Sequence, residues 1–137
     1  MTSLLLIFFG TFWETSMDII GNKHNYEMSV WKKIADYFDK NGHVKIGNSF
    51  WDNTFAWRNK WKNGNPTEGE KFFGSSTIFV VLMDGWHVVK YFWLIHFFAA
   101  IVFFKPISSN LILDFFICYV CYGIGHEFFL KILQKKV

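Results

Sequence analysis

Six ionisable side chains with the chemistry of metal ligands or proton carriers lie within otherwise apolar stretches of this 137-residue chain. Carboxylate and imidazole groups on facing helices can hold a divalent metal, as in carboxylate-bridged helix bundles. A metal-bound water can then hydrolyse or oxidise a substrate, or the same groups can relay protons or ions across a membrane. The six residues are Glu14 and Asp18, Asp84 and His87, and His126 and Glu127.

These residues reach similar depths if each apolar stretch is a helix that crosses the bilayer. Counted from the outer helix ends at about 1.5 Å per residue, Asp18 and His126 lie about 22 Å deep and His87 lies about 26 Å deep. A hydrocarbon core is about 30 Å thick, so all of these depths fall in its inner half. The sequence therefore predicts that the six side chains converge between the helices. The metal ligands among them would be Asp18, Asp84, His87 and His126.

The composition indicates a membrane protein. Hydrophobic residues make up 52% of the chain and aromatic residues 22%, whereas 18% of the residues are charged, which excludes a disordered protein. A water-soluble domain of this size does not need so apolar a composition. The formal net charge of +3 comes from basic residues beside apolar stretches and does not favour nucleic-acid binding. Two cysteines cannot form the disulfide framework of a small secreted domain.

Three apolar stretches predict an all-α integral membrane protein with one domain over residues 1–137. We expect transmembrane helices at about residues 3–21, 76–104 and 111–133, because a crossing helix needs about 20 apolar residues. Two carboxylates lie in the first stretch, so an interfacial or re-entrant helix is the alternative there. A tight hairpin joins the last two helices, since Pro106 cannot continue a helix.

The distribution of basic residues predicts the orientation. Nine Lys and Arg residues fall between residues 23 and 74, three more lie near the C-terminus, and the first 20 residues contain none. The positive-inside rule then places the 22–75 segment and the C-terminus in the cytoplasm and the N-terminus outside. We therefore expect a multi-pass protein of the inner, cytoplasmic membrane.

The cytoplasmic segment begins with an amphipathic pattern over residues 27–40. Trp31, Ala35 and Phe38 fall on one helical face, with charged residues on the other faces. Asn41-Gly42 is a suitable end for this helix, because glycine tolerates the left-handed conformation that closes many helices. The sequence therefore predicts an amphipathic helix on the cytoplasmic side.

Tryptophans then alternate with basic residues. Side chains of these types suit the lipid headgroup region, and they can also form a packed cap over the helices. They can stack on single-stranded nucleic acid as well, but that pattern is common by chance, and we expect no nucleic-acid partner. We therefore assign a membrane-interface role to Trp51, Trp57, Arg58, Lys60 and Trp61.

Three short motifs lie between residues 57 and 87. They are W-x-N-K followed by an aromatic residue at 57–61, G-S-S at 74–76, and D-x-W-H at 84–87. This run resembles small uncharacterised integral membrane proteins of bacteria and their phages, in which the same motifs recur. The resemblance carries no activity, but it implies that the motif residues matter to whatever the family does. These residues are Trp57, Asn59, Lys60, Gly74, Ser75, Asp84, Trp86 and His87.

Three functions are compatible with these patterns. The first is a subunit or scaffold of a membrane assembly, as a homo-oligomer or with other membrane subunits, in which the polar residues fix helix packing. The second is a metal-dependent enzyme that acts on membrane lipid or its headgroup at the inner leaflet. The third is a small channel or holin-like pore. Gly123 and Gly125 favour close helix approach in each case.

Overall fold

The computed structural model describes residues 2–43 and 47–134, and the regular elements in these residues are all helices. The all-α prediction is therefore confirmed. Three helices are long and apolar enough to cross a membrane: α1 (Thr2–Gly21), α6 (Gly85–Val102) and α7 (Leu111–Leu133). The bounds of α1 and α7 agree with the predicted spans to within one residue. The chain thus has the architecture of a multi-pass membrane protein.

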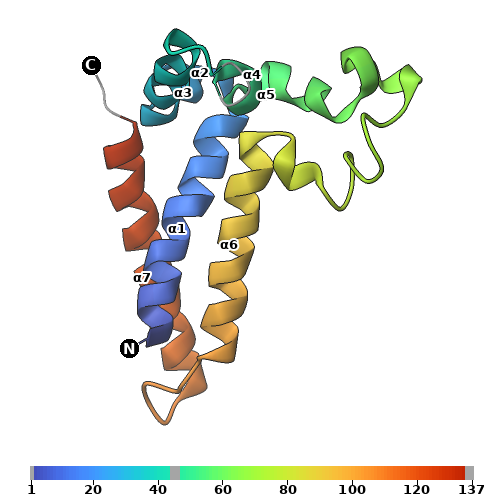
Figure 1. The fold of residues 1–137 in the computed structure, drawn as a ribbon. Helices are drawn as coiled ribbons and strands as arrows, with labels where there is room; N and C mark the ends of the chain where they lie inside the picture. Colours follow the sequence, from blue (N-terminus) through green and yellow to red (C-terminus); the bar gives the residue numbers. More distant parts are fainter. Residues whose placement is uncertain (1, 44–46, 135–137) are drawn as a thin grey trace.

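The helix α1 stands between α6 and α7 and packs against both of them (Figure 1). It runs antiparallel to α6 and parallel to α7. The start of α1 lies beside the α6–α7 hairpin, where Ser3 Oγ donates a hydrogen bond to Phe103 O at 2.8 Å. The other ends of α1 and α7 lie together beside the short helices (Figure 1). Lys135 and Lys136, which enter the orientation prediction, lie outside the described residues.

Polar side chains close the hairpin between α6 and α7. The Asn110 side chain caps α7 by accepting hydrogen bonds from Ile112 N and Leu113 N. The buried Asp114 carboxylate accepts hydrogen bonds from Ile107 N at 3.0 Å and Ser108 N at 2.9 Å. Asn110 thus satisfies backbone donors that the start of α7 leaves free, and Asp114 joins the turn to the helix.

The second transmembrane helix is shorter than the predicted 76–104 span. Residues 73–83 form turns and the 3-10 helix η5 (Val80–Leu82), and α6 starts only at Gly85. Asp84 is extended, with φ −153° and ψ 153°, and its carboxylate accepts a hydrogen bond from His87 N. Asp84 is therefore an N-cap and not a residue inside a helix. Apolar composition over residues 76–84 does not distinguish these two cases.

Short helices form a cap at the cytoplasmic end of the predicted topology. They are α2 (Lys23–Glu27), α3 (Val30–Lys40), α4 (Asn48–Trp51), α5 (Asn53–Ala56) and the 3-10 helices η2 (Trp57–Lys60), η3 (Lys62–Gly64) and η4 (Pro66–Glu68). The predicted amphipathic helix corresponds to α3. It starts later than expected because Ser29 accepts a hydrogen bond from Lys32 N and caps it. Ala35 of α3 packs in a buried cluster with Ile20 and Val89, which joins the cap to α1 and α6.

Candidate metal centre

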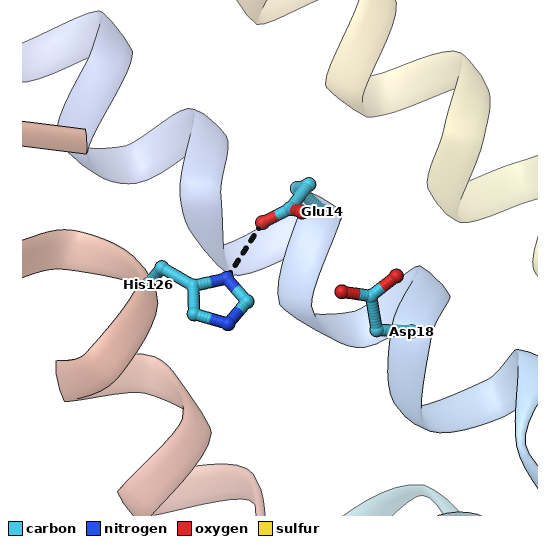
Figure 2. Close-up of side chains that lie close together, drawn as sticks. All are labelled: Glu14, Asp18 and His126. Atoms are coloured by element: carbon cyan, nitrogen blue, oxygen red, sulfur yellow. Dashed lines mark hydrogen bonds and ion pairs between the residues drawn. The ribbon is translucent and has the colours of Figure 1, made fainter. Parts of the chain in front are cut away.

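Glu14 and Asp18 lie one turn apart on α1, and His126 approaches them from α7. Figure 2 shows the two carboxylates and the imidazole facing a common space between the two helices. One ligand atom from each side chain can be chosen so that all three lie within 4.8 Å of one another. Glu14 and His126 are half-buried, whereas Asp18 is exposed. Three of the six predicted site residues therefore come together.

Gly125 lets α7 come close enough for this contact. A Cβ atom at position 125 would clash with Thr11 Oγ1 and would lie 3.1 Å from the backbone oxygen of Phe8. The next residue, His126, consequently reaches α1. At Gly123, no atom of the described residues lies within 4 Å of an added Cβ. Close approach was expected at both glycines, and it occurs at Gly125.

Hydrogen bonds fix the position of the imidazole. His126 Nδ1 lies 2.8 Å from Glu14 Oε2 and 3.3 Å from Thr15 Oγ1. The Tyr122 ring stacks near the His126 ring, with 6.4 Å between centroids. The Tyr122 hydroxyl also interacts with the Glu14 carboxylate. The sequence reasoning missed Tyr122 and Thr15, although the i, i+4 spacing of Tyr122 and His126 places both on one helical face.

The charges at this cluster are incompletely balanced. Two carboxylates share one imidazole, and no lysine or arginine of residues 2–43 and 47–134 forms an ion pair with either carboxylate. Glu14 has His126 as its partner, whereas the exposed Asp18 carboxylate has no ion pair among these residues. The cluster therefore has free capacity for a cation.

The dimensions of the cluster suit one transition-metal ion. Carboxylate oxygen and imidazole nitrogen bind such ions at about 2.0–2.2 Å, so two ligands of one ion lie at most about 4.4 Å apart. The three ligand atoms lie within 4.8 Å of one another, close to this separation. Two oxygen donors and one nitrogen donor suit Zn²⁺, Mn²⁺ or Fe²⁺ and leave further coordination positions for water and substrate.

Asp84 and His87 form a separate pair at the start of α6. His87 Nδ1 lies 2.6 Å from Asp84 Oδ1, and Lys60 Nζ lies 3.6 Å from Asp84 Oδ2. Burial alone would raise the pKa of Asp84, but hydrogen bonds from His87 and the nearby His87 and Lys60 charges outweigh burial and lower that pKa. This carboxylate is thus ionised and fully partnered.

The six predicted residues lie in three separate places in the structure. In the described part of the chain, the metal-binding geometry joins Glu14, Asp18 and His126, and does not include Asp84 or His87. The reason is that Asp84 is held at the N-terminus of α6 as its cap. Glu127 is exposed on α7 and is also outside the group. A ligand set of Asp18, Asp84, His87 and His126 is therefore not assembled.

The residues assigned to the membrane interface occupy different environments. Trp51 stacks on Trp31, with 4.8 Å between centroids, and fits against Gly85, where a Cβ atom would clash with its ring. Lys60 points to Asp84, and Trp61 is half-buried. Trp57 and Arg58 are exposed, and the guanidinium lies 5.5 Å from the indole centroid. Trp51 and Lys60 thus belong to a packed cap.

Hydrogen bonds connect several residues of the three sequence motifs. Asn59 Nδ2 donates to Ser49 O at 2.8 Å and to Met83 O at 2.9 Å. Ser75 Oγ, which is fully buried, donates to Lys60 O at 2.7 Å. With the contact between Lys60 and Asp84, these bonds tie residues 57–61 and 74–76 to the start of α6. The motif side chains at these positions therefore hold the cap on the helix.

Comparison of the chain with protein-family models, with curated proteins and with solved structures gives no match.

Proposed function

We propose that this protein is a metal-dependent membrane enzyme that acts on a lipid, with Glu14, Asp18 and His126 as the ligands of one divalent metal ion. The observation that carries this proposal is the convergence of the three side chains within 4.8 Å. A pair of Glu14 and His126 is sufficient to join α1 to α7. The additional carboxylate of Asp18 does not help packing, but it completes a three-ligand set.

The cluster lies between two helices that are apolar enough to cross a membrane, which favours a lipid as substrate. A divalent metal supplies a Lewis acid that polarises a carbonyl or phosphoryl oxygen and activates water. The chain's own residues bring the ligands together: the 2.8 Å hydrogen bond between Glu14 and His126 Nδ1 holds two of them side by side and would give way to the metal when both bind it, and Thr15 contacts the same nitrogen at 3.3 Å. The Tyr122 hydroxyl interacts with Glu14 and so helps to hold this ligand.

Metal content tests this proposal. Protein is purified in detergent without chelator, and its Zn, Mn and Fe are measured by elemental analysis after dialysis against each metal. We expect about one ion per chain for the wild type. Glu14→Gln, Asp18→Asn and His126→Gln are each expected to weaken binding at least about tenfold, because each removes a ligand.

Glu127→Gln is the matched control for Glu14→Gln, since Glu127 is the same residue type, adjoins His126 and is exposed. This variant is expected to bind metal like the wild type. Absence of bound metal in the wild type after dialysis would contradict the proposal. An equal loss of bound metal in Glu127→Gln and Glu14→Gln would contradict the proposal as well.

A second candidate function, a subunit of a membrane assembly, is favoured by an exposed apolar patch before α6. The patch comprises Phe72, Phe73, Ile78, Phe79 and Leu82, and Phe73 is 84% exposed. It belongs to the part of the chain that extends sideways from the helix bundle (Figure 1). Exposed patches of this kind are typical of protein or membrane contacts.

The mass of the protein in mild detergent tests the assembly function. If the patch joins subunits, the wild type forms an oligomer or copurifies with a partner, and Phe73→Ser together with Ile78→Ser releases the monomer. Phe98→Ser, on the exposed surface of α6, is the control and leaves the assembly intact. A monomeric wild type without a partner would contradict this function.

A further inference from the structure

A groove lies between α6 and α7, with α1 as its floor. Its volume is about 350 Å³. It exists because α6 and α7 pack mainly against α1 and hardly against each other. The residues that shape it include Gly10, Trp93, His96, Ala100, Cys118 and Tyr122.

The groove continues towards the hairpin end of the bundle. Ala100 and Cys118 also line two adjoining hollows that reach Phe104 and Leu111. At the opposite end lies Tyr122, whose ring stacks near His126 and whose hydroxyl interacts with Glu14. The groove therefore leads from the hairpin to the candidate metal centre, within the apolar layer of the protein.

The width of the groove decides what fits into it. From Trp93 to Ala100 the helix rises about 10 Å, and the groove volume of about 350 Å³ is spread along this length. A transmembrane helix with its side chains is about 10–12 Å across and does not fit. Carbon atoms make contact at about 3.5–4.0 Å, so a single hydrocarbon chain fits.

The polar groups near the groove agree with a lipid chain as occupant. His96 Nδ1 lies 2.9 Å from Phe92 O, so its ring is held by its own helix. Lys105 is exposed at the hairpin end and can pair with a lipid phosphate there. The remaining lining is almost entirely aliphatic and aromatic, as a hydrocarbon chain requires.

We propose that the groove between α6 and α7 binds one acyl chain of a phospholipid, with the headgroup at the hairpin end and the chain directed to Tyr122. This lipid is distinct from the substrate of the proposed function, because its carbonyl and phosphoryl groups lie at the hairpin end, away from Glu14 and His126. Its binding does not depend on the metal.

Photo-crosslinking tests the proposal. The protein is reconstituted in phosphatidylcholine vesicles that contain a phospholipid with a diazirine in its acyl chain, and labelled residues are mapped by mass spectrometry. We expect the label to concentrate on groove residues such as Trp93, Cys118 and Tyr122. Cys118→Trp, which fills the groove, is expected to reduce this labelling at least tenfold. Phe116→Trp is the control, because Phe116 is exposed on the same helix outside the groove.

The outcomes separate this proposal from the metal proposal. Labelling spread evenly over the exposed faces of α6 and α7 in the wild type would overturn the groove proposal, whether or not Cys118→Trp folds. If the groove residues carry no label, and if the wild type forms dimers that Cys118→Trp abolishes, a second copy of the chain occupies the groove. This result would also overturn the proposal. Metal content is measured on the same samples, and Cys118→Trp is expected to keep its metal if only the groove is blocked.

Discussion

The two polar sites of the molecule differ in how completely their charges are partnered. The Asp84 carboxylate, 1% exposed, has the His87 backbone and imidazole and the Lys60 ammonium around it. The α1–α7 cluster has two carboxylates and a single imidazole. The Asp84 site can therefore be explained by stability alone, whereas the α1–α7 cluster has capacity for a ligand.

The carboxylates of the two sites differ in partners because they occupy different positions in their helices. Asp84 precedes the first turn of α6, where backbone N–H groups are free and the helix dipole favours a negative charge. Glu14 and Asp18 lie inside α1, where the backbone donors already bond within the helix. Their charge therefore needs side chains, water or a metal ion.

Loss of the Asp84 carboxylate is expected to have the largest effect on stability. Asp84→Ala removes the N-cap and leaves Lys60 and His87 without their buried partner, at a cost of about 3 kcal/mol. The measurement is the free energy of unfolding in detergent. Asp18→Ala, with chelator present, is expected to change it by less than about 0.5 kcal/mol, since this exposed carboxylate then has no ligand to lose. Equal losses in the two variants would remove the distinction between the sites.

The contact at Gly125 is expected to have the next largest effect. Gly125→Ala pushes α7 away from Thr11 and Phe8, which we expect to cost about 1–3 kcal/mol. It should also weaken metal binding, because His126 moves away from Glu14. Gly123→Ala meets open space and is expected to stabilise α7 by up to about 1 kcal/mol. Unfolding and metal titration of both variants test this, and a stabilising Gly125→Ala would refute the close packing.

A pH dependence is the smallest expected effect. The pKa of Asp84 is lowered from its ordinary value of 3.8 in the folded protein. Its contribution to stability is therefore fully present above about pH 4 and is lost as the pH falls through the lower, folded pKa. Wild type and Asp84→Asn are compared by unfolding between about pH 5 and about pH 2. We expect a smaller loss of stability in acid for Asp84→Asn, and parallel curves would show that Asp84 has no lowered pKa.

The sequence was sufficient for the transmembrane helices but not for the start of α6. Length and hydropathy locate α1 and α7 well, since both are regular apolar helices with clear ends. Residues 76–84 are as apolar as a helix, and only the cap contacts of Asp84 and Ser75 show that they are turns. The bond from Ser75 to Lys60 spans 15 residues, which local composition does not reveal, whereas the bond at Asp84 is a local N-cap contact.

The sequence predicted which residue types form the candidate site, but only some of the residues that belong to it. Counting depth placed Asp18 and His126 at one level, and they lie in one group. The same count assigned His87 to that level, because it assumed a continuous second helix and ignored helix rotation. Close approach was expected at Gly125, and the i, i+4 spacing places Tyr122 on the same face as His126. Their partners on α1, Thr11 and Glu14, do not follow from the spacing within α7.

X-ray absorption spectroscopy of the zinc-loaded protein tests the central claim most directly. We predict oxygen and nitrogen neighbours at about 2.0–2.1 Å from the metal, with the scattering of one imidazole. The imidazole signal should disappear in His126→Gln and persist in His87→Gln. An imidazole signal that is lost in His87→Gln and kept in His126→Gln would contradict a metal centre between α1 and α7.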